Sequence, residues 1–181
     1  MKRLVILITV LLAAACASLL GPRDIDVPLA RLQEGMERRF PYNQRYLGLF
    51  DVSATNPRLA LQPDVNRIAA TMDLSVTPVL AFGNAGVRGA LTLSGVPRVD
   101  TARGMLVLGD PRVEDIRIAG LDHGYGAQIA GIASFVAAQL LGDLPVYTFA
   151  PGAFRYAGVS FAPVKIVTRP DRLVVTFAPV K

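Results

Sequence analysis

The amino-acid sequence predicts an α+β fold: a curved antiparallel β-meander wrapped around a long apolar C-terminal helix, with an N-terminal amphipathic helix. Three observations predict it. Residues 28–40 carry apolar side chains at helical spacing, several runs between residues 46 and 119 alternate at the period of a strand, and residues 124–142 contain no formally charged side chain.

The first residues have the organisation of a signal peptide. Met1-Lys2-Arg3 is cationic and is followed by a nine-residue, mainly aliphatic block, Leu4–Leu12, whereas a membrane span needs roughly 20 residues. Small residues then precede Cys16, the only cysteine. Ala14-Ala15-Cys16 resembles the lipobox of lipoprotein signal peptides, although Ala13 stands where leucine is more common.

We therefore expect residues 1–15 to be a lipoprotein signal peptide. We expect Cys16 to carry a covalent diacylglycerol and an N-acyl chain such as palmitate, with no other cofactor. Two alternatives are an ordinary secretory signal with an incidental Cys16 and a free N-terminal membrane helix. Inner-membrane lipoproteins commonly carry Asp after the lipidated cysteine, and this chain has Ala17. The resemblance thus implies an anchor at the periplasmic face of the outer membrane.

The remaining chain is expected to form a tether over residues 16–23 and a single domain over residues 24–181. Loss of Lys2 and Arg3 lowers the formal charge from +5 to +3. The arginines are spread singly and form no basic run, so the sequence does not indicate a nucleic-acid-binding surface. Weak attraction to anionic lipid head groups is a minor alternative.

The first folded element is expected at Pro28, which suits the first turn of a helix. Apolar residues at Leu29, Leu32, Met36 and Phe40 follow at helical spacing, and Pro41 ends the helix. Strands are then predicted from alternation at 46–61, 67–77, 87–94, 105–108 and 113–119, with breaks at Asn56-Pro57 and Gly109-Asp110-Pro111. A final hairpin is predicted from 164–168 and 173–177, joined by a turn over 169–172.

The segment Gly124–Gly142 is predicted to be a buried helix. Ile129, Ile132, Phe135 and Val136 form its broad apolar face, and small residues cover the rest. A helix that is apolar all round must be surrounded, so the sheet is expected to enclose it. A transmembrane helix is the alternative, which the internal glycines and glutamines disfavour.

The sequence shows no catalytic constellation. His123 is the only histidine, without a second ligand at metal-binding spacing, and no serine lies in a Gly-x-Ser-x-Gly elbow. Gly124-Tyr125-Gly126 lacks the third glycine of a dinucleotide-binding fingerprint, because Ile129 stands there. We therefore expect neither an enzyme nor a metal site.

Several segments resemble the YceB-like bacterial lipoproteins, whose function is undefined. The resemblance rests on RRFPYNQRYLGLFDVSATNPRLAL (residues 38–61), GDPRVEDIRIAG (residues 109–120) and the late apolar helix, in the same order. That family looks like a half-module of the tubular lipid-binding (TULIP) superfamily. The resemblance implies an acyl chain held between helix and sheet.

The expected function is therefore binding of an acyl chain or other apolar ligand by an anchored lipoprotein, with the membrane as partner through the anchor. The alternative is a structural or interaction module of the cell envelope with a fully packed core. The predicted ligand-binding residues lie on the helix (Ile129, Ile132, Phe135 and Val136) and on the strands (Met72, Leu74, Val76, Leu91 and Leu93).

Overall fold

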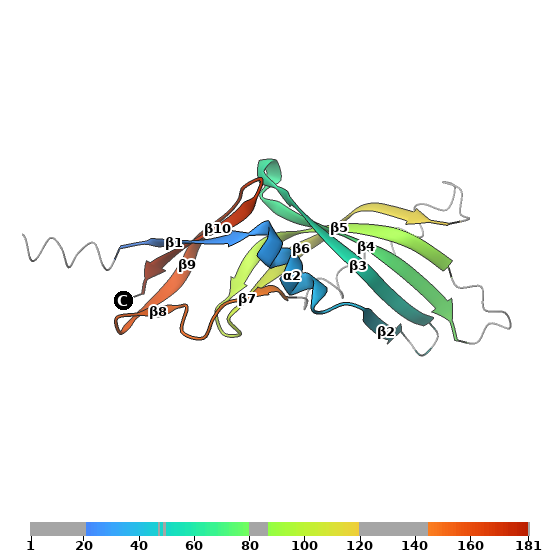
Figure 1. Ribbon diagram of the computed structural model, residues 1–181, viewed down its shortest axis with the longest axis horizontal. Coiled ribbons are helices and arrows are strands. Elements are labelled where there is room, and N and C mark those ends of the chain that lie inside the picture. Colours follow the sequence, from blue (N-terminus) through green and yellow to red (C-terminus); the bar gives the residue numbers. More distant parts are fainter. Residues whose placement is uncertain (1–20, 47, 49, 80–86, 120–144, 181) are drawn as a thin grey trace, which may run out of the picture.

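The computed structural model describes residues 21–46, 48, 50–79, 87–119 and 145–180. They form an elongated molecule of two antiparallel sheets (Figure 1). The four-stranded sheet has the order β1-β10-β9-β8 and the six-stranded sheet the order β2-β3-β4-β5-β6-β7. The strands are β1 (Arg23–Pro28), β2 (Tyr42–Tyr46), β3 (Phe50–Gln62), β4 (Arg67–Pro78), β5 (Val87–Asp100), β6 (Met105–Ile118), β7 (Pro145–Thr148), β8 (Arg155–Tyr156), β9 (Val159–Thr168) and β10 (Arg172–Pro179).

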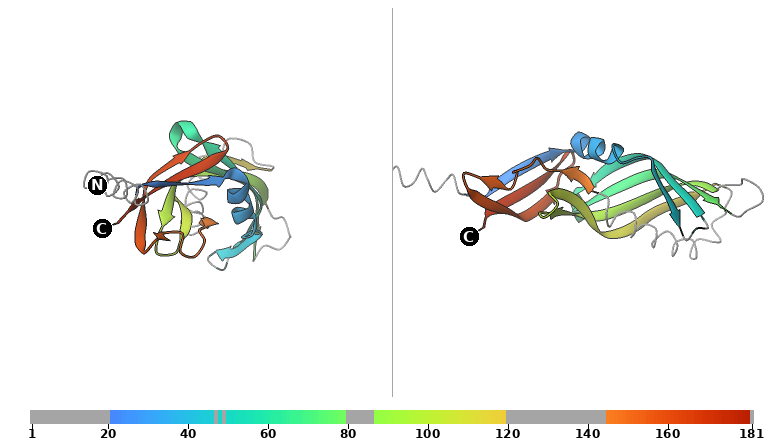
Figure 2. Two further views of the ribbon diagram at one scale, coloured as in Figure 1. Left: turned by 60° about the vertical axis from the view of Figure 1, so that its left-hand side comes forward. Right: turned by 90° about the horizontal axis from the view of Figure 1, so that it is seen from below.

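One α-helix, α2 (Leu29–Glu37), and one short 3₁₀ turn, η1 (Pro63–Val65), are present among these residues. Helix α2 buries Leu32 and Met36, two members of the predicted apolar stripe. It packs against β3 and β7, where the two sheets meet (Figure 2). No helix of the described residues is long and apolar enough to cross a membrane.

The predicted α+β class is wrong, because the described residues lie mostly in strands and the only α-helix among them has nine residues. The expected enclosed helix, Gly124–Gly142, lies outside the described residues, and neither sheet wraps around a long helix within them. The meander is also divided into two sheets. In the smaller sheet, β10 pairs with β1, from Arg23↔Phe177 to Pro28↔Arg172, and with β9 on its other side.

The four-stranded sheet is curled. Its edge strands β1 and β8 are separated by two strands in the sheet order, yet the guanidinium of Arg23 lies 3.6 Å from the ring centroid of Tyr156. This cation–π contact joins the two edges. Between them, an aromatic cluster fills the interior, in which Phe177 of β10 meets Phe149 and Phe154 with ring centroids 6.0 and 5.3 Å apart.

The six-stranded sheet is built from long strands with bulges. Strands β5 and β6 have 14 residues each, and their register shifts between Thr92 and Leu93 and again between Ser94 and Val96. Two strands were expected in the region of β6, separated at residues 109–111. The structure has one, since Asp110 adopts a left-handed conformation with φ of 48° and the chain bulges there without leaving the sheet.

Candidate functional site

The predicted ligand-binding residues of the strands lie together on one face of the six-stranded sheet. Because side chains alternate along a strand, Met72, Leu74 and Val76 of β4 share a face. Met72 pairs with Leu91 of β5, and Leu91 pairs with Ile116 of β6. We call this surface the apolar face; it comprises Met72, Leu74, Val76, Leu91, Leu93, Val113 and Ile116.

Burial decreases along the apolar face. Met72 is 1% exposed and Leu91 and Leu93 are 0% exposed, whereas Leu74 and Val76 are only half-buried. The face is therefore covered around Met72, Leu91 and Leu93 and more open toward the C-terminal end of β4. The other predicted ligand-binding residues, Ile129, Ile132, Phe135 and Val136, lie outside the described residues, as does Cys16.

The opposite face of the same sheet is polar. The hydroxyl oxygens of Thr71 and Thr92 lie 3.0 Å apart across β4 and β5. Asn56 donates a hydrogen bond of 2.7 Å from its side-chain amide to the carboxylate of Asp73. An apolar ligand on this sheet must therefore bind the apolar face.

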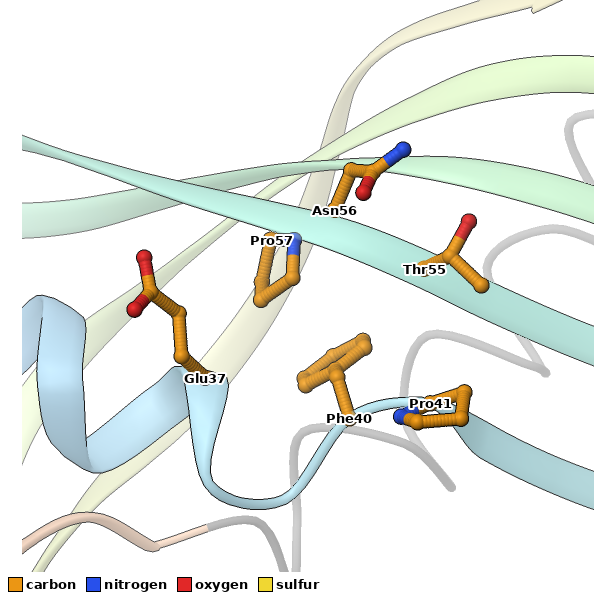
Figure 3. A pocket seen from close by; sticks show the side chains of 6 residues that line it. All are labelled: Glu37, Phe40, Pro41, Thr55, Asn56 and Pro57. Carbon is orange, nitrogen blue, oxygen red and sulfur yellow. The ribbon is translucent and has the colours of Figure 1, made fainter.

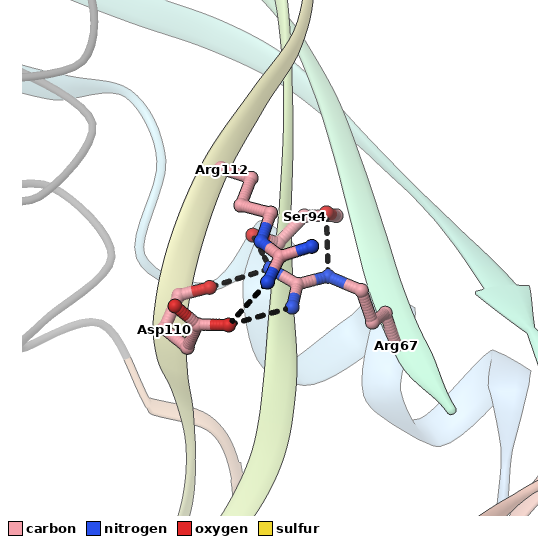
Figure 4. Close-up of polar contacts among 4 residues, drawn as sticks. All are labelled: Arg67, Ser94, Asp110 and Arg112. Carbon is pink, nitrogen blue, oxygen red and sulfur yellow. Dashed lines mark hydrogen bonds and ion pairs between the residues drawn. The ribbon is translucent and has the colours of Figure 1, made fainter. Parts of the chain in front are cut away.

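A buried arginine crosses the polar face near the bulges of β5 and β6 (Figure 4). Arg67 is 6% exposed. Its Nε donates to the hydroxyl oxygen of Ser94 at 2.9 Å, and its Nη2 donates to the carbonyl oxygens of Ser94 and Asp110. Its Nη1 lies 3.0 Å from Oδ2 of Asp110, which also receives Arg112 at 3.2 Å. Hydrogen bonding to Arg67 and the charge of Arg112 lower the pKa of Asp110.

The Arg67 network is structural. The guanidinium is held by hydrogen bonds to β5 and β6, which fixes strands that have lost their regular ladder at the bulge. Sequence reasoning placed Arg67 on the polar side of its strand but missed this network. The only signal was an arginine at the start of an alternating strand, and its partners stand 27 and 43 residues further along the chain.

A cleft of about 400 Å³ opens between the end of α2 and the bulge of β3 (Figure 3). Gln33 ties these elements together, since its side chain accepts from the backbone N–H of Leu59 at 2.8 Å and donates to the carbonyl oxygen of Pro57 at 2.6 Å. The lining combines aromatic, prolyl, hydroxyl, amide and carboxylate groups without a catalytic pairing. It comprises Glu37, Phe40, Pro41, Thr55, Asn56 and Pro57.

A second cavity, of about 370 Å³, lies between α2 and β7. We call it the basic groove because three of its lining residues are arginines. Its lining comprises Arg31, Glu34, Gly35, Arg38, Arg39, Pro145, Tyr147 and Thr148. In the described part of the chain, no group of three or more His, Cys, Asp or Glu side chains is placed to hold a metal ion, and His123 lies outside that part.

Comparison with known proteins gives a family match and a distant structural likeness. Residues 30–172 match the family described as “Protein of unknown function (DUF1439)”; the description does not mention the YceB-like lipoproteins. No curated protein matches. Seven chains of solved structures match, among them “Crystal structure of lipopolysaccharide binding protein”, with a TM-score of 0.37 and 9% sequence identity. That match covers 87% of this chain and 40% of the other, so this chain spans less than half of its length.

Proposed function

The chain belongs to the DUF1439 family of proteins of unknown function, and we propose from its own geometry that it binds an acyl chain or another elongated apolar ligand on the apolar face. One observation carries the proposal. The apolar face continues beyond the covered core to Leu74 and Val76, which keep part of their surface exposed. A ligand that covers this end completes the burial.

The chemistry of the apolar face suits such a ligand. Its side chains are aliphatic or thioether groups, and the charged residues of β4 and β5, such as Asp73 and Arg88, are exposed on the opposite side. Binding pockets for apolar ligands are mostly hydrophobic, and each buried methylene contributes about 0.8 kcal/mol. No charged partner is needed for affinity.

The size of the face also suits an elongated ligand. The path along β4 from Ala70 to Val76 is roughly 20 Å long at about 3.3 Å per residue, and β3 to β6 span roughly 14 Å at about 4.8 Å per strand. This area can contact many methylene groups at once. A small, compact apolar molecule would use only part of it.

We further propose that the protein is a lipoprotein anchored through Cys16 at the periplasmic face of the outer membrane. Strand β1 begins at Arg23, seven positions after Cys16, so the chain between them reaches at most about 25 Å. The start of β1 and the C-terminal end of β4 lie at opposite ends of the long axis (Figure 1). The open end of the apolar face would then point away from the membrane surface that holds the anchor.

A tryptophan reporter tests ligand binding, since the chain contains no tryptophan. Leu74→Trp places an indole at the half-buried end of the apolar face, and Ser75→Trp places one on the opposite face as a matched control. Titration with a saturated fatty acid should shift and intensify the Leu74→Trp emission with saturation and leave the Ser75→Trp emission unchanged. Native mass spectrometry of the gently purified wild-type protein should detect a bound lipid.

The alternative is an interaction module with a completely filled core. It predicts no co-purified lipid and no saturable change in the Leu74→Trp emission, and this pair of results would overturn the ligand-binding proposal. The anchor is tested separately by mass spectrometry of the protein from its native envelope. The mature chain should begin at Cys16 with added acyl mass, and Cys16→Ser should accumulate as precursor; an unlipidated N-terminus elsewhere contradicts the anchor.

A further inference from the structure

The basic groove lies between α2 and β7 and uses none of the residues of the apolar face. We infer that it binds a phosphate group carried by a ligand. The inference goes beyond the proposed function, since it rests on other residues and holds whether or not an acyl chain occupies the sheet.

Two of the three arginines in the groove are available for a ligand. Arg38 forms an ion pair with Glu34, with its Nη2 3.7 Å from Oε2 of Glu34, and the two side chains are 76% and 53% exposed. Within the described residues, the side chains of Arg31 and Arg39 have neither an ion-pair partner nor a hydrogen bond. Both are exposed and line the same groove. Their guanidinium groups can therefore turn toward an anion without breaking an existing contact.

The helix and the strand form a built wall around these arginines. A Cβ atom at Gly35 would collide with the carbonyl oxygen of Val146, so the helix backbone lies directly against β7. Tyr147 packs edge-on against Phe149 with ring centroids 5.1 Å apart, which fixes its ring in the lining. Tyr147 and Thr148 of β7 also line the groove, and each side chain carries a hydroxyl group that can donate a hydrogen bond.

Phosphate fits this donor set best. Guanidinium groups present planar pairs of N–H donors that match the oxygens of a phosphate, and hydroxyl groups can satisfy a remaining oxygen. A single carboxylate has two oxygens and would occupy one arginine only. The three arginines exceed the single Glu34, so the groove has a net positive charge that matches a phosphomonoester dianion. The volume of about 370 Å³ leaves room for the group that carries the phosphate.

The phosphate could belong to a lipid head group or to a soluble ester, and three probes distinguish these sources. Calorimetric titrations of the full chain in a non-ionic detergent would use glycerol 3-phosphate, monomeric dihexanoyl phosphatidic acid and, as the phosphate-free control, dihexanoylglycerol. Arginine Nε–H NMR signals, assigned with the single Arg31→Gln and Arg39→Gln variants, would report the site. We expect saturable shifts of the Arg31 and Arg39 signals with the two phosphates only.

The double variant Arg31→Gln/Arg39→Gln should weaken phosphate binding by at least about tenfold, because two charge-assisted contacts are lost. The control Arg88→Gln/Arg155→Gln removes the same charge at two exposed positions outside the groove and should change affinity by less than about twofold. Tighter binding of phosphatidic acid than of glycerol 3-phosphate assigns a lipid head group, and equal binding assigns a soluble ester.

Failure to bind either phosphate, or equal affinity in the double variant and the wild type, would overturn the inference. The apolar face is read separately, by the fatty-acid titration of the Leu74→Trp variant without detergent. A phosphate response without an emission change separates this groove from the apolar face, so failure of one proposal remains distinguishable from failure of the other.

Discussion

Strands β10 and β4 have the same sequence period but different surroundings. In β10, the inward residues Leu173, Val175 and Phe177 are all buried, with exposures of 0, 0 and 2%. On the apolar side of β4, Ile68, Ala70 and Met72 are buried, whereas Leu74 and Val76 are half-buried. Alternation therefore specifies which face of a strand is apolar, and the elements packed on that face decide how far it is covered.

The difference follows from what packs on each sheet. The inward side of β10 meets aromatic rings, including Phe149, which contacts Phe177 edge-on. Residues Leu32 and Met36 of α2 join the same core, and α2 packs on β3 and β7 near the junction of the sheets. The four-stranded sheet has a closed interior, and the six-stranded sheet has an apolar face that is open at one end.

The largest expected effect separates these two regions directly. Leu173→Ala should destabilise the protein by about 2–5 kcal/mol, because it leaves a cavity in a closed interior. Leu74→Ala removes the same atoms from the half-buried end of β4 and should cost about 1 kcal/mol. Urea unfolding of both variants gives the two values. Similar losses would show that the two strands are equally covered and would contradict the comparison.

The second effect concerns Arg67, which lies on the polar face of the six-stranded sheet and holds β5 and β6 together where the apolar side of the sheet is buried. Arg67→Met should cost about 2–3 kcal/mol, because the buried hydroxyl group of Ser94 and the bulge at Asp110 lose their partner. Arg112→Met removes an exposed arginine that contacts the same carboxylate and should cost less than about 0.5 kcal/mol. Urea unfolding measures both, and equal costs would mean that Arg67 does not fix the bulge.

The sequence predicted the local elements better than their assembly. Helical spacing predicted the helix over residues 28–40, and α2 spans Leu29–Glu37. Alternation predicted the strand over residues 67–77, and β4 spans Arg67–Pro78. These patterns depend on neighbours a few residues away, so a single segment is enough to reveal them.

The division into two sheets could not be predicted in the same way. Ile25 and Val27 alternate with Asp24 and Asp26, but this run is short and its partner β10 lies near the other end of the chain. The candidate site has the same limit. The sequence placed Met72 and Leu91 on apolar sides of their strands, but the basic groove depends on α2 meeting β7, which is more than a hundred residues away.

A smaller effect is expected at Gly95 of β5, where the backbone lies close to Leu108 of β6. A Cβ atom at Gly95 would lie 2.6 Å from Cβ of Leu108 and 3.2 Å from the carbonyl oxygen of Gly109. Gly95→Ala should therefore cost about 1–2 kcal/mol through overpacking. The matched control is Gly109→Ala, whose Cβ would meet the flexible end of the Arg98 side chain and should cost less than about 0.5 kcal/mol. Thermal unfolding compares them, and an equal or larger cost for Gly109→Ala would contradict the assignment.

The smallest effect is expected at the open end of the six-stranded sheet, where Arg45 of β2 faces Asp51 of β3. Arg45 donates from Nε and Nη2 to the carboxylate at 2.7 and 2.9 Å, and this hydrogen bonding lowers the pKa of Asp51. Because the pKa is lowered on folding, the stabilisation is present above the pKa of the unfolded chain and is lost as the pH falls through the folded-state pKa. Both side chains are about half exposed, so the loss should be confined to the edge strand.

Amide exchange in β2 should therefore accelerate relative to exchange in β10 as the pH falls below the ordinary pKa of an aspartate, about 4, after correction for the intrinsic pH dependence, while the global unfolding transition changes little. Arg45→Gln should raise the pKa of Asp51 toward its ordinary value, measured by NMR titration of the carboxyl carbon, and should remove the acid sensitivity specific to β2. Arg155→Gln, which removes an exposed arginine of β8 in the four-stranded sheet, should leave both measurements unchanged. If β2 and β10 lose protection together on acidification, the open end is coupled to the closed interior more tightly than their burial implies, because local opening of β2 would then require unfolding of the whole domain.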